Sequence, residues 1–355
     1  MKKRLILLLL ACFSVVANSQ NKNDEAQKKL QIAIEFMDTG RPDEAITLLN
    51  DAKKLDPTNS VYDYEIGYAN YVKGDYKKAI AIFKKLAKSK YAYDGVYQML
   101  GNSYDMNGSS KKALETYSQG LKLFPKSGRL YLETGNVYWQ QSKYDQAVTA
   151  YQKGIEVEPR FSSNYFRSGL LYLNSTEKVW GLISGEMLRI LEPESKRSRE
   201  IGALMFKTYQ SNINFTSDTT MSVSFSQSQR LSSDKDGSIK LPFGITVYEP
   251  LLMLSAIGKK EITLSTLTQI REQFINLYFE KGYDKKYPSA LFSYHKQLID
   301  SGHFETFNQW LYSDANKEEF EKWKETNSTK WDAFVDWFEA NPINITDENR
   351  LRLEE

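Results

Sequence analysis

Few side chains in this sequence have the types and spacing that catalysis or metal binding requires. The two histidines of the 355-residue chain, His295 and His303, are eight residues apart with Gly302 between them. They do not share one helix at ligand spacing, and no third ligand lies near them in the sequence. The only cysteine, Cys12, falls in an apolar stretch near the N-terminus. We therefore expect no catalytic residue, no metal site and no cofactor, and we do not predict an enzyme.

The remaining polar side chains indicate binding rather than catalysis. Asp105 and Glu133 could approach each other, but nothing in the sequence indicates the paired environment that acid–base catalysis needs. Asn102 and Asn136 are 34 residues apart. A side-chain amide can donate to a peptide carbonyl and accept from a peptide N–H, so these two residues could hold an extended backbone.

The spacing of 34 residues continues far beyond these two asparagines and defines the elements that position them. Glycine, alanine and proline recur in three series at this period. The series are Gly67, Gly101, Gly135 and Gly169; Ala45, Ala79, Ala113 and Ala147; and Pro57, Pro125, Pro159 and Pro193, with Tyr91 breaking the last. A fixed period of this length is the signature of a repeat architecture.

Each unit of the repeat is predicted to be a pair of helices. In the third unit, one apolar face at helical spacing leads to Gly108, and a second leads to Pro125. The glycine of the first helix and the alanine of the second are small because the two helices should cross closely there. One pair cannot bury its apolar face alone, so the units stack. The end units depart from the pattern with Ala33 and Gly181, as terminal units of such arrays often do.

This pattern resembles the tetratricopeptide repeat, with five units over residues 26–195. The resemblance implies a mainly α fold, a superhelix (α-solenoid) of about five helix pairs whose first helices line a concave groove. It also implies that the groove binds a protein or peptide. The groove residues that it implies are Tyr64, Tyr68, Tyr71, Gln98, Asn102, Arg129, Asn136, Trp139 and Phe166.

One subgroup of this family grips the C-terminal carboxylate of chaperones, and the present chain departs from that subgroup. Gln98 stands where such a clamp needs a lysine, and Ser163 stands where it needs a basic residue. Glu133 would repel a carboxylate. We therefore do not expect a carboxylate clamp.

The N-terminus has the pattern of a signal peptide over residues 1–19. Three basic residues precede the apolar segment Leu5–Val16, which is too short to span a bilayer, and small residues follow before Gln20. We expect export to the periplasm or the cell envelope. The segment ending in Cys12 also resembles a bacterial lipobox, which leaves lipidation of Cys12 as an alternative and makes a lipid anchor the only membrane contact we consider.

The segment after the repeats changes in composition. Residues 196–210 are predicted to form a capping helix. Residues 211–248 are rich in serine and alternate between apolar and polar residues on both sides of a turn at 234–237, which predicts a loop and a β-hairpin, with a disordered linker as the alternative. Residues 249–342 are predicted to form a helical domain, and residues 343–355 a flexible tail.

The sequence therefore predicts an exported, non-enzymatic scaffold that binds a protein or peptide in its groove. The net charge of +2 gives no indication of a nucleic-acid partner. Two alternatives remain open. The chain could be a structural subunit of an envelope complex assembled through its aromatic C-terminal domain, or residues 211–342 could contain an enzyme of unrecognised type.

Overall fold

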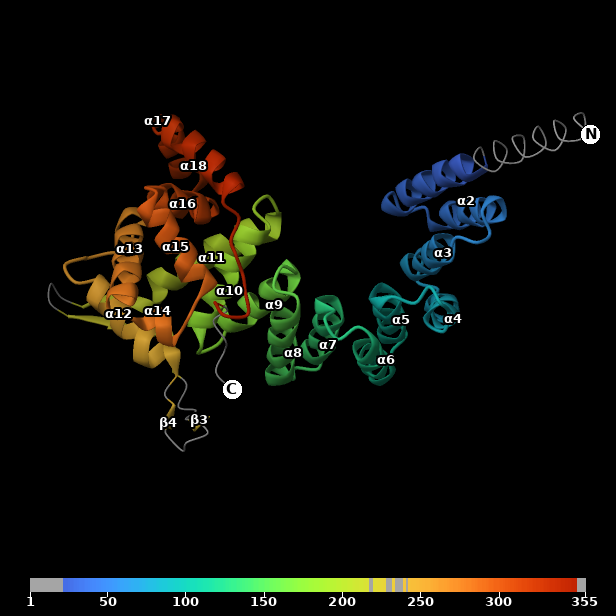
Figure 1. Cartoon of the computed structure of the whole chain (residues 1–355), viewed down its shortest axis with the longest axis horizontal. Coiled ribbons are helices and arrows are strands. Elements are labelled where there is room, and N and C mark those ends of the chain that lie inside the picture. Colours follow the sequence, from blue (N-terminus) through green and yellow to red (C-terminus); the bar gives the residue numbers. More distant parts are fainter. Residues whose placement is uncertain (1–21, 217–219, 228–231, 234–238, 241, 350–355) are drawn as a thin grey trace, which may run out of the picture. The chain divides into compact units, whose positions relative to one another are not determined.

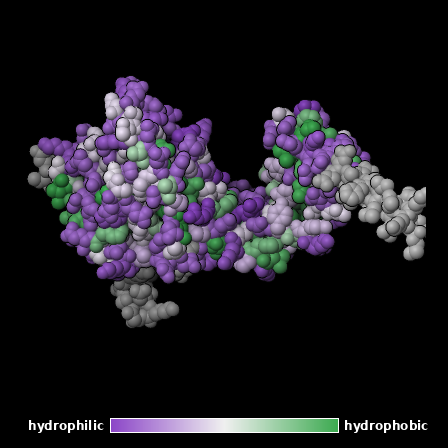
Figure 2. All heavy atoms as spheres, turned by 45° about the horizontal axis from the view of Figure 1, so that its top comes forward, coloured by the Kyte–Doolittle hydropathy of each residue, from purple (hydrophilic) through white to green (hydrophobic). Residues whose placement is uncertain are grey.

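The computed structural model describes residues 22–216, 220–227, 232–233, 239–240 and 242–349 (Figure 1). The signal peptide predicted over residues 1–19, Cys12 within it, and the last part of the predicted tail lie outside these residues. The chain divides into two compact units, residues 1–147 and 148–355. Hydrophilic side chains cover most of the face shown in Figure 2, and hydrophobic ones appear in small separate patches. Each unit is described by itself below.

The first unit is a row of helices, each of which packs mainly against its neighbours in the sequence. A helix covers the described residues 22–38. The helices that follow are α2 (Pro42–Leu55), α3 (Val61–Val72), α4 (Tyr76–Ala87), α5 (Asp94–Met106), α6 (Ser110–Leu123), α7 (Gly128–Gln140) and α8 (Tyr144–Val157). The division between the two units falls within α8. With α9 and α10 of the second unit, these helices make the five predicted pairs, and the mainly α solenoid class is confirmed.

At Gly67 and Gly101, an aromatic ring of the partner helix occupies the space that a side chain would need. A Cβ atom at Gly67 would lie 2.8 Å from the Phe83 ring, and one at Gly101 would lie 2.1 Å from the Tyr117 ring. Ala79 and Ala113 on the second helices are completely buried. The period of the sequence therefore records one packing arrangement that is used repeatedly.

The turns between paired helices use a left-handed residue. Gly74 and Gly108 have φ angles of +86° and +77° at the same position of successive repeats. In the next repeat this position is Ser142, which adopts φ of +57° despite its side chain. A side chain makes this conformation costly, because the Cβ atom approaches the following carbonyl oxygen.

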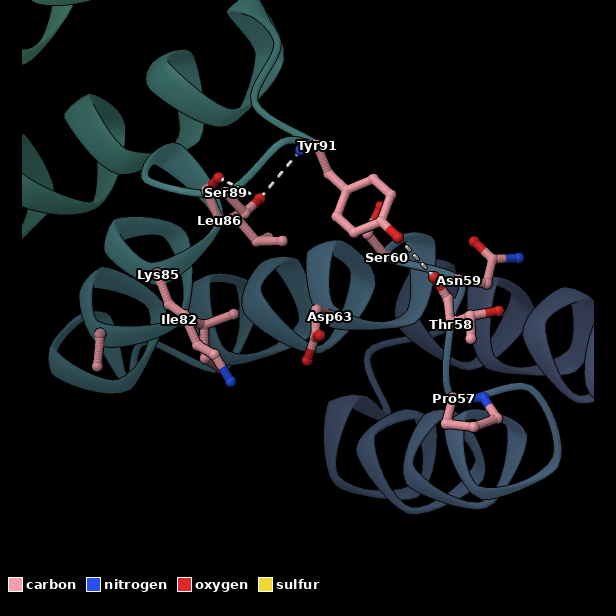
Figure 3. A pocket seen from close by; sticks show the side chains of 11 residues that line it. Pro57, Thr58, Asn59, Ser60, Asp63, Ile82, Lys85, Leu86, Ser89 and Tyr91 are labelled. Atoms are coloured by element: carbon pink, nitrogen blue, oxygen red, sulfur yellow. Dashed lines mark hydrogen bonds between the residues drawn. The ribbon is translucent and has the colours of Figure 1, made fainter.

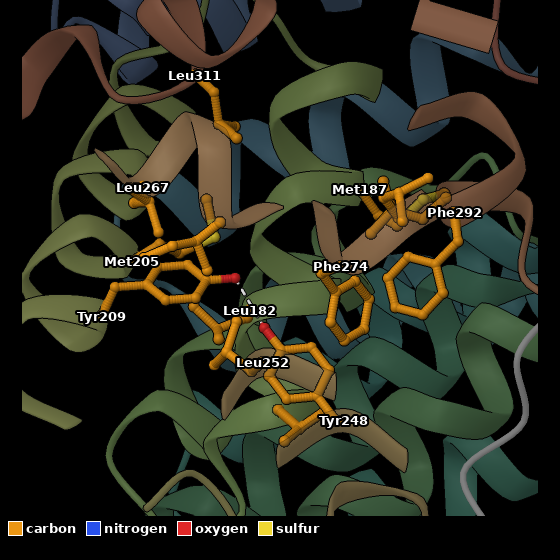
Figure 4. Packing of buried hydrophobic residues seen from close by; sticks show 14 of the residues in the cluster. Leu182, Met187, Met205, Tyr209, Tyr248, Leu252, Leu267, Phe274, Phe292 and Leu311 are labelled. Atoms are coloured by element: carbon orange, nitrogen blue, oxygen red, sulfur yellow. Dashed lines mark hydrogen bonds between the residues drawn. The ribbon is translucent and has the colours of Figure 1, made fainter. Parts of the chain in front are cut away.

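The second unit continues with helices around one large apolar core. Its first three complete helices are α9 (Ser162–Leu173), α10 (Lys178–Leu191) and α11 (Lys196–Asn212). The helical elements after the serine-rich segment are the π-helix η1 (Gly244–Tyr248), α12 (Glu249–Ser255), α13 (Leu264–Glu280), α14 (Tyr283–Lys286), α15 (Ala290–Asp300), α16 (Phe304–Leu311), the 3-10 turn η2 (Ser313–Ala315), α17 (Lys317–Thr326) and α18 (Ser328–Ala340). The core joins buried residues from Tyr165 to Ile343 (Figure 4). Thus α9 and α10 share their core with the C-terminal segment.

Two departures from the repeat pattern follow from this shared core. At Gly181, a Cβ atom would lie 2.6 Å from the backbone nitrogen of Leu173, so α9 and α10 approach too closely for the alanine of other repeats. The helix predicted to cap the array, α11, lies against α9 and α10 and also contacts residues of α16 and η2. The Cβ position of Gly202 on α11 is only 2.3 Å from the Leu311 carbonyl oxygen.

The serine-rich segment contains the expected hairpin, but with different arms. Strands β1 (Ile213–Phe215) and β2 (Met221–Val223) pair antiparallel, with Asn214 opposite Ser222. Strands β3 (Ser232–Ser233) and β4 (Ile239–Lys240) form a second short antiparallel pair. The alternation over residues 239–247 predicts a second strand, and this prediction is wrong for residues 244–247, because residues 244–248 form the π-helix η1.

The buried residues between Phe243 and Leu251 fit both the alternation of a strand and the spacing of a helix. Phe243 and Val247 are buried, as a strand of alternating residues would require, but Ile245 between them is 41% exposed. Tyr248 and Leu251 are buried instead. Burial at 243, 247 and 251 follows a helix, and the aromatic core selects this face.

Candidate functional site

The structure places the predicted groove residues on the first helices of the repeats. Tyr64, Tyr68 and Tyr71 lie on α3, Gln98 and Asn102 on α5, and Arg129, Asn136 and Trp139 on α7. Phe166 lies on α9 in the second unit. The side chains in the first unit fall mainly into three groups, one of amides, one of tyrosines and one ion pair.

The amide group joins α5 to α7 through a carboxylate. The Gln98 side chain donates from Nε2 to Oε1 of Glu133 at 2.8 Å, and Asn136 donates from Nδ2 to Oε2 at 3.0 Å. Both donors are neutral, and Glu133 has no ion pair within the described residues. The two amides therefore hold the carboxylate in place and leave its negative charge uncompensated.

Asn102 is bound from the second helix of its own repeat. The Tyr117 hydroxyl donates to Oδ1 of Asn102 at 2.5 Å. Burial raises the pKa of Tyr117, and the charges of Glu133 and Asp105 raise it further, so this phenol stays protonated and remains a donor. The amide nitrogen of Asn102 has no hydrogen-bond partner in the described chain and can donate to a ligand.

The tyrosine group lies on and around α3. Tyr68 and Tyr71 stack with their centroids 6.4 Å apart, and Tyr71 meets Tyr76 edge-on at 5.6 Å. Burial raises the pKa of Tyr71, and the charges of Glu133 and Asp105 add to the shift, so these carboxylates lie close enough to act on α3. Tyr68 is 37% exposed and available for contact.

Tyr64 belongs largely to the packing. Its ring meets Phe83 at 5.5 Å and Tyr93 at 5.6 Å. The next residue, Glu65, is partly buried, and this burial raises the pKa of its carboxyl group. Glu65 and Asp105 have no ion pair within the described residues, whereas Arg129 pairs with Asp94 at 3.3 Å (Nε to Oδ2). Among the described residues, helices α3, α5 and α7 thus carry three carboxylates without an ion pair, Glu65, Asp105 and Glu133, while Arg129 on α7 is paired with Asp94.

Asp105 and Glu133 were considered from the sequence. Glu65, Asp94 and Tyr117, which lie among the same side chains of α3, α5 and α7, were not predicted. Tyr117 lies on a second helix, and only the position of its hydroxyl places it beside Asn102. Glu65 follows Tyr64 directly, and its partial burial has no signal in the sequence.

Phe166 has a different environment in the second unit. The guanidinium of Arg197 lies 5.1 Å from the ring centroid and that of Arg167 lies 5.8 Å away. Arg197 is fixed by Glu192, with Nη2 2.6 Å from Oε2. Phe166 is half-buried, and Arg197 covers part of its ring.

A second polar cluster, absent from the sequence predictions, lies inside the second unit. Glu186 on α10, Arg271 on α13 and His295 on α15 are 2–4% exposed. His295 Nε2 is 2.9 Å from Oε2 of Glu186, and Arg271 donates to Glu186 and to Asn308. The three residues are far apart in the sequence, so no local motif could reveal them.

The charges of this cluster balance. Burial alone would raise the pKa of Glu186, but Arg271 and His295 outweigh it and hold that pKa below its usual value. Burial lowers the pKa of His295, which favours the neutral ring. The cluster borders a cavity of about 20 Å³, beside the Tyr209 and Tyr248 hydroxyls that lie 2.7 Å apart (Figure 4). A space of that size holds about one water molecule, so a substrate does not fit.

The described residues offer neither a cluster of metal ligands nor a membrane-spanning helix. Within these ranges, no three His, Cys, Asp or Glu side chains gather as metal ligands would. No helix in the same ranges combines the length and apolar character needed to cross a bilayer.

Paired helices that repeat one packing arrangement every 34 residues define the class of α-solenoid repeat proteins. Residues 30–94 and 99–164 match the family model described as "Tetratricopeptide repeat". The comparison with curated proteins returned no match.

Several solved structures are similar over about half of the chain. A tetratricopeptide-repeat protein of Thermus thermophilus, TTC0263, is 20% identical, with 51% of this chain and 98% of that chain covered and a TM-score of 0.43. PilF of Pseudomonas aeruginosa is 17% identical, with 53% and 86% covered and a TM-score of 0.42. MamA of Desulfovibrio magneticus RS-1 is 20% identical, with 49% and 98% covered and a TM-score of 0.36.

Proposed function

We propose that this chain is a non-enzymatic scaffold that binds an extended segment of another protein along α3, α5 and α7. The bound segment would carry at least one arginine or lysine. The observation that supports this most directly is Glu133, a carboxylate fixed by two neutral amides and lacking an ion pair in the described chain. A cationic side chain would supply the missing charge, and a charge-assisted hydrogen bond is stronger than a neutral one.

The surroundings of Glu133 fit the same partner. Asp105 adds negative charge, and the rings of Tyr68 and Tyr71 offer faces on which a guanidinium or ammonium group can lie. The unused amide nitrogen of Asn102 can donate to a peptide carbonyl. Aromatic faces, an amide and a carboxylate together suit a peptide better than a small metabolite.

The proposed setting is outside the cytoplasm. This part of the proposal rests on the N-terminal sequence pattern, with basic residues, a short apolar segment and small residues before Gln20. The mature chain would then act in the periplasm or at the cell envelope, with a lipid anchor at Cys12 as the alternative to free release.

The two other functions considered from the sequence gain no specific support. The aromatic residues that would form an assembly surface largely pack together, since the Trp310 ring meets Phe338 at 5.2 Å and Phe334 at 6.2 Å inside the core. The polar cluster of Glu186, Arg271 and His295 is enclosed beside a cavity too small for a substrate.

A charge-removing substitution tests the proposed function. We would measure binding of the capped peptide Ac-Gly-Ser-Arg-Leu-Ser-Gly-NH2 to the full chain by titration calorimetry at low salt. Glu133→Gln keeps the shape of the side chain and removes its charge, and we expect it to weaken binding at least fivefold, about 1 kcal/mol. Glu115→Gln makes the same change at an exposed position on α6 and is the matched control. Equal binding by wild type and Glu133→Gln, or equal weakening by the control, would contradict the proposal.

A further inference from the structure

A cavity of about 380 Å³ lies in the second repeat, away from the residues assigned to the groove. Its walls come from the loop between α2 and α3, the start of α3, one side of α4 and the loop after α4 (Figure 3). Figure 3 shows the Tyr91 ring over one side of this space and Ile82, Lys85 and Asp63 along the other. The volume falls within the range of sites that bind small ligands or peptide side chains.

The cavity coincides with the place where the repeat pattern is broken. Tyr91 stands where the other repeats have a proline, and Ser89, two residues earlier, stands where the others have Leu55, Leu123, Val157 and Leu191. The second helices α2, α6, α8 and α10 each have 14 residues, whereas α4 has 12. The cavity therefore coincides with the loss of an aliphatic residue, a proline and half a turn of helix.

The altered loop is held in its position by hydrogen bonds. The Tyr91 hydroxyl donates to the Thr58 carbonyl at 3.2 Å, which ties the loop to the preceding repeat. The Tyr91 backbone N–H donates to Oγ of Ser89 at 3.1 Å, and this hydroxyl donates to the Leu86 carbonyl at 2.8 Å. Ser89 therefore supports the conformation of the wall.

The lining combines an apolar surface with one unpaired positive charge. Pro57, Ile82 and Leu86 supply apolar atoms. The carboxylate of Asp63 is already paired with Lys53. Lys85 also lines the cavity, and it has no ion pair or hydrogen bond from its side chain within the described residues.

We propose that this cavity is a second binding site, for a protein segment in which a large apolar side chain is followed by a carboxylate. The apolar side chain lies against Pro57, Ile82 and Leu86 beneath Tyr91, and the carboxylate pairs with Lys85. This partner chemistry is opposite in charge to that of the groove. The site stands on its own residues, and it holds whether or not the groove binds a basic peptide.

The test is a nuclear magnetic resonance titration of the full chain with the capped peptide Ac-Gly-Leu-Glu-Gly-NH2. We expect amide shifts confined to residues 57–63 and 81–91, saturating at millimolar peptide, and at least threefold weaker binding of the Leu-Gln peptide. Lys85→Gln should weaken binding of the Leu-Glu peptide by a similar factor. Lys84→Gln, which removes the charge of an exposed neighbour on α4 that does not line the cavity, should leave binding unchanged.

A filling variant completes the test. Ala81→Leu adds a side chain from α4 and leaves both hydrogen bonds of Ser89 in place, so it should abolish the shifts, provided that the variant unfolds at an unchanged temperature. If Ala81→Leu unfolds early, the smaller Ala81→Val replaces it. Equal binding by Lys85→Gln and wild type, or shifts that map to the groove, would overturn the proposal. Loss of self-association in sedimentation velocity on filling the cavity would also overturn it, since the occupant would then be a second copy of this chain.

Discussion

At the scale of single residues, the most consequential group is the buried trio of Glu186, Arg271 and His295. Arg271 donates to both Glu186 and Asn308, and all three side chains of the trio are almost completely enclosed. A buried ion pair contributes little net stability compared with apolar residues of the same shape, but removing one partner leaves the other charge buried and unpaired. The trio therefore fixes the arrangement of α10, α13 and α15 more than it adds to the stability of the fold.

Arg271→Met is predicted to destabilise the second unit by about 3–5 kcal/mol, because Glu186 would lose its compensating charge. The measurement is urea unfolding followed by circular dichroism. The double variant Glu186→Gln/Arg271→Met should be more stable than Arg271→Met alone, because it leaves no charge behind. If the double variant were less stable than either single variant, the two residues would not act as a pair.

The same residues predict how stability depends on pH. Burial lowers the pKa of His295, and the unfolded chain binds a proton there below about pH 6.5. In this range the unfolded state binds more protons than the folded state, so the free energy of unfolding falls as the pH falls. Glu186, whose folded pKa is also lowered, adds a further loss below about pH 4.3.

Urea unfolding at pH 7.5 and pH 5.5 checks this dependence. His295→Gln should remove most of the difference between the two pH values. Burial also lowers the pKa of His303, the other and more exposed histidine, so His303→Gln should remove a smaller part of the difference. A pH dependence that is the same in wild type and His295→Gln would show that other groups cause it.

At the scale of the elements, the repeat turn makes a prediction of its own. Ser142 adopts a left-handed conformation that glycine adopts in the two preceding repeats. Ser142 is exposed, so its side chain contributes no buried contact. Ser142→Gly should raise the free energy of unfolding by about 0.5–1 kcal/mol, because relief of the steric cost exceeds the added flexibility of the unfolded chain.

The converse substitution is the control. Gly108→Ser places a side chain at the same turn of the preceding repeat. It should lower the free energy of unfolding by a similar amount, which urea unfolding measures for both variants. Nothing lies within 4 Å of a Cβ atom built at Gly108, so any loss comes from the backbone conformation rather than from a clash. A rise on both substitutions would exclude backbone strain as the cause.

The elements also show how far the sequence could lead. The five helix pairs were predictable because Gly101 packs against Tyr117 in the same way as Gly67 packs against Phe83, and a repeated contact leaves a period. The residues around Phe243 were not predictable by period, since their burial fits a strand and a helix until Ile245 is seen to be exposed. The candidate groove residues could be placed on first helices, but not the partners of their side chains, such as Tyr117 for Asn102. Glu186 and Arg271 meet across 85 residues, which no local pattern records.

At the scale of the whole molecule, the boundary between repeats and C-terminal segment differs from the boundary between packing units. The repeat pattern continues to residue 195, but the buried residues of α9 and α10 belong to the same core as those of α11, α13 and α15. Leu182 and Leu188, for example, are at most 1% exposed. The fifth helix pair therefore folds as part of the second unit, although its sequence belongs to the array.

This arrangement predicts the outcome of cutting the chain after residue 195. The truncated chain keeps every repeat of the sequence pattern, yet it exposes the apolar faces of α9 and α10 and leaves Glu186 without Arg271. Unburying several large apolar side chains costs about 1.5–3 kcal/mol for each, which a single helix pair cannot recover. Amide hydrogen exchange should therefore show loss of protection over residues 162–191, while residues 61–123 in the first unit remain protected. If residues 162–191 kept full-length protection in the truncated chain, the fifth repeat would be stable without the C-terminal segment, and the core would divide at residue 195 as the period of the sequence alone suggests.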